Sequence, residues 1–143
     1  MNFHNWSAED YEKLTKATNR TLHWRLGMNG PYKLDSDVID QLIADGVAGN
    51  YRLSRSDYGE PFIVDYIGRS DEDLAGRIKD HIVEGYGQFA CVEKASDVEA
   101  YYQECHDFHF FGGDIGLLDN DADKGHPHLP KGYSLKCPVC EVV

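Results

Sequence analysis

The feature that most constrains the fold is an alternation of strand and helix signals over residues 47–111. Residues 50–54 have the pattern of a strand, residues 62–67 are rich in β-branched and aromatic side chains, and the turn-forming segment between them predicts a hairpin. A helix is expected over residues 71–83, followed by a short third strand at 88–93 and a further helix. This order predicts an α/β (α+β) domain with a small antiparallel three-stranded sheet flanked by helices.

The segments on either side of this region differ in character. Residues 1–46 are expected to be a helical extension, because Ser7 begins the pattern of a capping box and a second helix should start near Ser36. Residues 112–143 show no regular period and cannot bury much apolar area without a staple such as a metal. With 143 residues in all, we expect the core at 47–111 and both extensions to form one compact domain.

The formal net charge of −11, from 14 basic and 25 acidic residues, limits the classes of partner. Non-specific nucleic-acid affinity comes from Lys and Arg that neutralise phosphates, so a general polyanion-binding surface is not expected. No apolar run approaches the roughly 20 residues that span a bilayer, and the N-terminus lacks the pattern of a secretory signal. We therefore expect a cytoplasmic protein with no membrane partner.

Residues whose side chains could take part in catalysis lie on successive predicted elements of the core. They are two tyrosines on adjacent strands, an arginine and a histidine one turn apart on the next helix, and a glutamate on the later helix: Tyr51, Tyr66, Arg77, His81 and Glu104. Alone, each residue type is common in structural roles. Their order along the chain is what indicates a shared site.

This order resembles the GIY-YIG nuclease superfamily, which is named for its two strand motifs. Gly49-Asn-Tyr51 stands at the place of the first motif, with Asn50 where the family has an apolar residue, and Tyr66-Ile-Gly68 matches the second motif. Leu74-x-x-Arg77 matches the helix that supplies the family's arginine, and residues 99–104 resemble the helix whose last acid holds the metal. The resemblance covers residues 47–111, less than half of the chain.

The resemblance implies a metal-dependent endonuclease that hydrolyses DNA phosphodiester bonds. In that family's scheme, Tyr51 would be the general base and Arg77 would pair with the phosphate oxygens. Glu104 would bind Mg²⁺ or Mn²⁺ through oxygen, as hard cations prefer. Supporting roles fall to two further sets of residues: Tyr66 and His81 in the catalytic cluster, and Arg52 and Arg69 in substrate binding.

Two departures from the family's pattern leave a second hypothesis about the function open. No asparagine stands at the expected distance after Glu104, and Asn120 is only a loose candidate for that role. The charge of −11 also opposes tight DNA binding. The alternatives are an endonuclease for branched or damaged DNA that relies on a recruiting protein, and a weak or inactive GIY-YIG-like module that serves in interactions.

The cysteines predict a second site. Cys105 and His109 are i and i+4 on one helical face, and Cys137 and Cys140 form a C-x-x-C in the irregular tail. Together they make a Cys₃His set suited to structural Zn²⁺. Three histidines are rival ligands: His126 above all, with His106 and His128. Unbound thiols and a redox pair remain alternatives, and Cys91 is expected to be a core residue.

Overall fold

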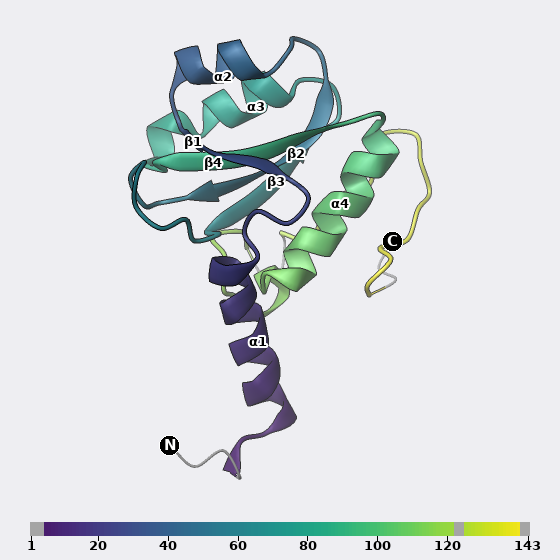
Figure 1. Ribbon diagram of the computed structural model, residues 1–143. Helices are drawn as coiled ribbons and strands as arrows, with labels where there is room; N and C mark the ends of the chain where they lie inside the picture. Colours follow the sequence, from purple (N-terminus) through teal and green to yellow (C-terminus); the bar gives the residue numbers. More distant parts are fainter. Residues whose placement is uncertain (1–4, 122–124, 141–143) are drawn as a thin grey trace.

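The computed structural model describes residues 5–121 and 125–140, and these form a mixed α+β domain (Figure 1). The described strands are β1 (Asn29–Lys33), β2 (Ala48–Ser54), β3 (Tyr66–Ser70) and β4 (Gln88–Lys94). They form one antiparallel sheet in the order β1-β4-β2-β3. The α+β class is confirmed, but the sheet has four strands where the sequence predicted three.

β1 is the additional strand, and its composition explains why it was not expected. It contains Gly30 and Pro31, two residues that in a sequence usually indicate a turn or loop. However, β1 lies at the edge of the sheet, where a proline that lacks an N–H is tolerated. Gly30 has φ of +140° and lies so close to β4 that a Cβ there would stand 3.1 Å from the Ala90 Cα. The glycine and the proline therefore suit this particular edge.

The predicted hairpin forms, but its second strand begins later than expected. β3 starts at Tyr66, which lies opposite Leu53 of β2. Residues 62–65 precede it without strand pairing in the described structure, and their aromatic and β-branched side chains serve the core instead. Phe62 and Val64 are both buried. A composition typical of a strand here reflects burial rather than sheet pairing.

The helices agree with the prediction in number and order, with changes at their ends. They are α1 (Ala8–Leu22), α2 (Ser36–Leu42), α3 (Leu74–Asp80) and α4 (Asp97–Phe110), with short 3₁₀ turns η2 (Ile82–Glu84) and η3 (Gly113–Ile115). The expected capping box at Ser7 is confirmed. α3 is shorter than the predicted 71–83 because the Asp73 carboxylate, which accepts from the Gly76 N–H at 3.1 Å, caps it later.

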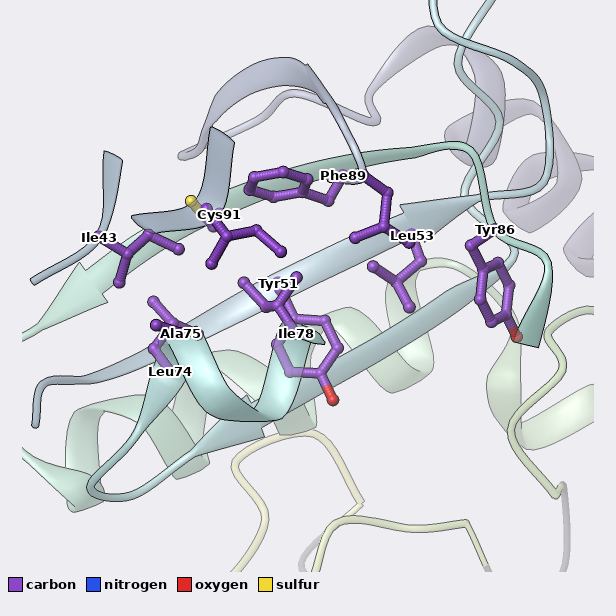
Figure 2. Packing of buried hydrophobic residues seen from close by; sticks show 11 residues of the cluster. Ile43, Tyr51, Leu53, Leu74, Ala75, Ile78, Tyr86, Phe89 and Cys91 are labelled. Atoms are coloured by element: carbon purple, nitrogen blue, oxygen red, sulfur yellow. The ribbon is translucent and has the colours of Figure 1, made fainter. Parts of the chain in front are cut away.

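The sheet lies between two helical layers, with α2 and α3 on one face and α4 on the other (Figure 1). The first core cluster lies under α2 and α3 and includes Tyr51, Leu53 and Phe89 (Figure 2). The second lies against α4 and includes Ile67 and Phe108. Alternation along β2 places successive side chains on opposite faces, so the strand contributes to both layers.

α1 projects from the body and buries none of its own residues (Figure 1). It is attached through its C-terminal half by polar contacts. Asn19 donates to the Phe110 carbonyl at 2.9 Å, and Lys16 pairs with Asp114 at 3.0 Å. Among the described residues, no helix is long and apolar enough to cross a bilayer.

A buried ion pair joins β2 to α4. Arg52 is 0% exposed and donates to both oxygens of Asp107, at 2.9 and 2.8 Å. Its remaining donors reach the carbonyls of Trp24 and Leu26, at 2.8 and 2.7 Å. The prediction that Arg52 binds substrate is wrong, because every edge of its guanidinium is used inside the fold. The sequence could not show this, since Asp107 lies far along the chain.

Candidate functional site

The tyrosines, the arginine and the glutamate of the predicted site line one pocket of about 420 Å³. Tyr51 and Tyr66 come from adjacent strands, Arg77 from α3 and Glu104 from α4. The sheet and both helical layers thus contribute to a single site. Other lining residues come from β3, the loop after it and the tail: Arg69, Asp71, Asp119, Asn120, Asp121, His126 and His128.

Gly68 explains how the two strand motifs fit together. It lies opposite Tyr51 in the β2–β3 pairing, and a Cβ at Gly68 would stand 2.4 Å from the Tyr51 hydroxyl oxygen. The tyrosine ring can therefore cross β3 only because this residue has no side chain. In Figure 2 the Tyr51 ring is part of the core cluster, with its hydroxyl oxygen directed away from the other side chains.

His81 was expected to support the site, and it contacts Tyr51 directly. Its Nε2 lies 2.8 Å from the Tyr51 hydroxyl, and its Nδ1 lies 2.5 Å from an oxygen of Glu84. An ionised carboxylate only accepts hydrogen bonds, so Glu84 favours the tautomer with the proton on Nδ1. In that tautomer Nε2 accepts the hydrogen bond from Tyr51. The result is a polar chain from Tyr51 through His81 to Glu84.

The electrostatics of Tyr51 bear on its role. Burial raises the pKa of Tyr51, and the neighbouring Tyr66 raises it further. The Tyr51 side chain is therefore a neutral phenol near pH 7 and not a phenolate. It can take a proton from another group only while passing its own proton on, and His81 Nε2 is in place to receive it.

Glu104 lies close to the pocket's other charged groups. Burial raises the pKa of Glu104 to about 7, against the opposing effect of Arg69. Arg69 Nη1 donates to a Glu104 oxygen at 2.5 Å, and its Nε donates to Asp71 at 2.8 Å. Arg69 lines the pocket as expected for a substrate-binding residue, but its guanidinium is held by two carboxylates. Carboxylate oxygens are ligands that hard cations prefer, so Glu104 could bind such a cation once Arg69 releases it.

Arg77 differs from Arg69 in this respect. It is exposed at the pocket, and its side chain has no ion-pair partner within the described chain. Asp73, the N-cap of the same helix, instead accepts from the Gly76 N–H. An arginine with free donors is suited to a bidentate contact with phosphate oxygens.

The tail supplies a wall of the pocket that sequence reasoning missed. Asn120 pairs with the backbone of Ile67: its Oδ1 accepts from the N–H at 3.0 Å and its Nδ2 donates to the carbonyl at 2.9 Å. Asp119 is held by Tyr86 at 2.7 Å and by Arg55 at 2.6 Å. The loose candidate Asn120 thus lies next to Tyr66, although its distance along the chain gave no such indication.

A second cluster brings together four metal-ligating side chains. Ligand atoms of His109, His126, Cys137 and Cys140 all lie within 4.8 Å of one another and could hold a metal ion. A tetrahedral zinc with bonds of about 2.0–2.3 Å separates its ligand atoms by about 3.3–3.8 Å, so closure requires only about 1 Å of adjustment. This set is His₂Cys₂, whereas the sequence predicted Cys₃His.

The donor chemistry of this cluster supports a metal. His109 Nε2 is buried and has no hydrogen-bond partner in the described structure, and Nδ1 on the other side of its ring lies 3.4 Å from Asp114. A carboxylate behind a metal-binding imidazole is a common arrangement. Burial raises the pKa of Cys137, but backbone hydrogen bonds at Cys140 and Val139 lower it overall, which favours the thiolate ligand.

Cys105 is not part of this cluster, and the rival ligand His126 takes its place. Cys105 is fully buried and packs with Tyr101 and Cys137. Burial raises the pKa of Cys105 to about 12, so it remains a thiol. Helical spacing correctly paired one face of α4 with the tail, but it could not show which tail residue reaches the site. Cys91 is buried in the core, as expected.

Comparison with protein-family models, with curated proteins and with solved structures gives no significant match for this chain.

Proposed function

We propose that this protein is a metal-dependent endonuclease of the GIY-YIG type that hydrolyses DNA phosphodiester bonds. The observation that carries the proposal is the pocket that gathers Tyr51, Tyr66, Arg77 and Glu104, with His81 bonded to Tyr51. A hydroxyl linked to a base, an unpaired arginine and a buried carboxylate are the groups that phosphodiester hydrolysis requires.

The mechanism follows from the contacts of Tyr51. Its oxygen takes a proton from the attacking water while its own proton passes to His81 Nε2, 2.8 Å away. Glu84 stabilises the imidazolium that forms. The hydroxide then bonds to phosphorus, the P–O bond to the leaving oxygen breaks, and that oxygen takes a proton from solvent. Returning the proton from His81 to solvent restores the site.

Two further residues act on the phosphate. Arg77 pairs with the non-bridging oxygens, whose charge increases in the transition state. Glu104 would hold Mg²⁺ or Mn²⁺, and such a cation would supply Lewis-acid stabilisation of the leaving oxygen. Tyr66 packs against His81, with ring centroids 4.8 Å apart, and keeps the imidazole in place.

The surface around the pocket limits which DNA is bound. A second depression shares Asp71 and Arg77 with the pocket and is otherwise rich in acids: Glu72, Asp73 and Asp80. With a net charge of −11, long contacts along a duplex backbone are unfavourable. We therefore propose branched or damaged DNA as the substrate, brought to the site by a recruiting protein.

Cutting of supercoiled plasmid and of branched DNA tests the proposal directly. We expect the purified protein to nick at least one of them with Mg²⁺ or Mn²⁺ and not with EDTA. Glu104→Gln should abolish the cutting, because it removes the cation's carboxylate while keeping the side chain's volume. Lys79→Met is the matched control, since Lys79 pairs with Asp40 away from the pocket. Undiminished cutting by Glu104→Gln would contradict the assignment.

One observation favours the alternative of a catalytically weak interaction module. Arg69 already neutralises Glu104, so the carboxylate has a partner without any metal. Absence of cutting on both substrates by a folded, zinc-loaded protein, with and without a DNA-binding partner, would favour this alternative.

We further propose that the His₂Cys₂ cluster binds structural Zn²⁺. It joins α4 to the tail, whose described part has no helix or strand after η3. A metal supplies the binding energy that such a segment cannot obtain from apolar burial. Cys137 and Cys140 form no disulfide in the described structure, which suits a reducing compartment.

Zinc binding by two variants distinguishes the His₂Cys₂ ligand set of the structure from the Cys₃His set predicted from the sequence. We expect one Zn²⁺ per chain in the wild type and in Cys105→Ala. His126→Ala should weaken zinc binding by at least about tenfold, since even an outer-shell partner is worth about 10–100-fold. Competition with a chromophoric chelator measures both affinities. Loss of zinc in Cys105→Ala with retention in His126→Ala would restore the Cys₃His set.

A further inference from the structure

The guanidinium of Arg69 lies between two carboxylates in the lining of the pocket. Nη1 donates to Glu104 at 2.5 Å, and Nε donates to Asp71 at 2.8 Å. The side chains of Arg69 and Glu104 are only 10% and 14% exposed. The Tyr101 ring lies beneath the guanidinium, 5.3 Å away. Arg69 is therefore a well-packed ion-pair partner rather than a free surface arginine.

The buried carboxylate explains why such a partner is needed. Taking a carboxylate out of water disfavours its ionised form unless a positive charge lies nearby. Arg69 is the basic residue that bonds Glu104 in the described structure. In the absence of a metal, Arg69 thus fills the position at Glu104 that a cation would take.

We propose that Arg69 is an internal counterion that exchanges places with the catalytic cation, and that it moves from Glu104 to the substrate phosphate when the cation binds. This inference rests on the proposed function. Arg69 donates to Oε1 of Glu104, so a divalent ion bound to the same carboxylate would lie beside the guanidinium, and two cations side by side repel each other. The released guanidinium remains at the pocket, where a phosphodiester is the available anion.

The exchange makes metal binding and phosphate binding interdependent. Without DNA, the cation must compete with Arg69 for Glu104, so its affinity is low. With DNA present, the phosphate stabilises the released Arg69, and the cation binds more tightly. Such coupling between two sites is reciprocal, and is typically worth 5–150-fold in affinity. Arg69 is in this view a positioning residue that links the two binding events.

Binding of Mn²⁺ alone to the zinc-loaded protein tests the exchange without any requirement for cutting. Electron paramagnetic resonance measures free Mn²⁺, and Glu104→Gln defines the signal from other sites. We expect Arg69→Met to raise the Mn²⁺ affinity by about 5-fold or more, because it removes the competing cation. Arg69→Lys keeps the positive charge but loses the planar set of guanidinium donors. Its Mn²⁺ affinity should lie between those of Arg69→Met and the wild type. Lys79→Met, with the same loss of charge elsewhere, should bind as the wild type does.

A second arm adds a short DNA hairpin at saturating concentration, under conditions in which Mn²⁺ is titrated before cutting proceeds. The hairpin should raise the Mn²⁺ affinity of the wild type by about 5-fold or more, and should leave that of Arg69→Met unchanged. Equal Mn²⁺ affinities of the wild type and folded Arg69→Met would overturn the exchange, even in a protein that cuts DNA. Failure of the proposed function is distinct: no cutting and no Mn²⁺ bound at Glu104.

Discussion

Asp107→Ala is expected to lower the free energy of unfolding by about 3–5 kcal/mol, because it leaves the buried charge of Arg52 without its partner. Arg52 is 0% exposed and Asp107 is 1% exposed, so water cannot replace the lost hydrogen bonds. Urea denaturation followed by circular dichroism measures the change. In a chain of this size we expect a fall in melting temperature of about 6–20 °C.

Two further variants show that the effect belongs to the pair. Glu93→Ala removes an exposed acid on β4 and should change stability by no more than about 0.5 kcal/mol. Arg52→Met combined with Asp107→Leu should recover much of the loss, since apolar residues can replace a buried pair without leaving an unpaired charge. An Asp107→Ala protein as stable as the wild type would contradict the structural role of Arg52.

Tyr51→Phe is expected to lower the cleavage rate by about 10²–10⁴-fold, the usual contribution of a group that transfers a proton in the transition state. Phenylalanine keeps the ring that packs in the core, so the fold should be retained while the hydroxyl next to His81 is lost. The rate is measured at saturating Mg²⁺ on the substrate that the wild type cuts. Tyr102→Phe, at an exposed site on α4, is the matched control.

The proposed proton path also predicts how variants combine. If Tyr51 passes its proton to His81, then His81→Asn should lower the rate by a similar factor, and the double variant should be little slower than either single variant. Residues that act as one unit are strongly non-additive in this way. Full activity of His81→Asn would show that Tyr51 does not depend on His81.

The residues that the sequence predicted well are those whose relation is local or set by a motif. Tyr66-Ile-Gly68 is such a case, because Gly68 is required where the Tyr51 ring crosses β3. Arg77 and Glu104 lie on helices whose caps and apolar positions are readable in sequence. Once these elements are packed on one sheet, the pocket follows from their order.

The residues that were predicted wrongly depend on contacts between distant segments. Arg52 was predicted to bind substrate, yet alternation along β2 turns it to the other face and to Asp107. Cys105 has the correct spacing from His109, but the path of an irregular tail decides that His126 completes the cluster. Neither the pairing of Arg52 with Asp107 nor the place of His126 is encoded in a local pattern.

The position of His126 has a consequence for how this protein depends on its surroundings. The same imidazole belongs to the metal cluster and lines the pocket that holds Tyr51 and Glu104. Neither core cluster contains a residue of the His₂Cys₂ cluster, so we expect the sheet and its helices to fold without the proposed zinc. If this cluster binds zinc as proposed, a cell short of zinc would accumulate a chain that is folded by most physical probes but whose pocket lacks a fixed wall. Abundance of this protein and its working capacity would then be separate quantities, the first set by synthesis and the second by metal supply.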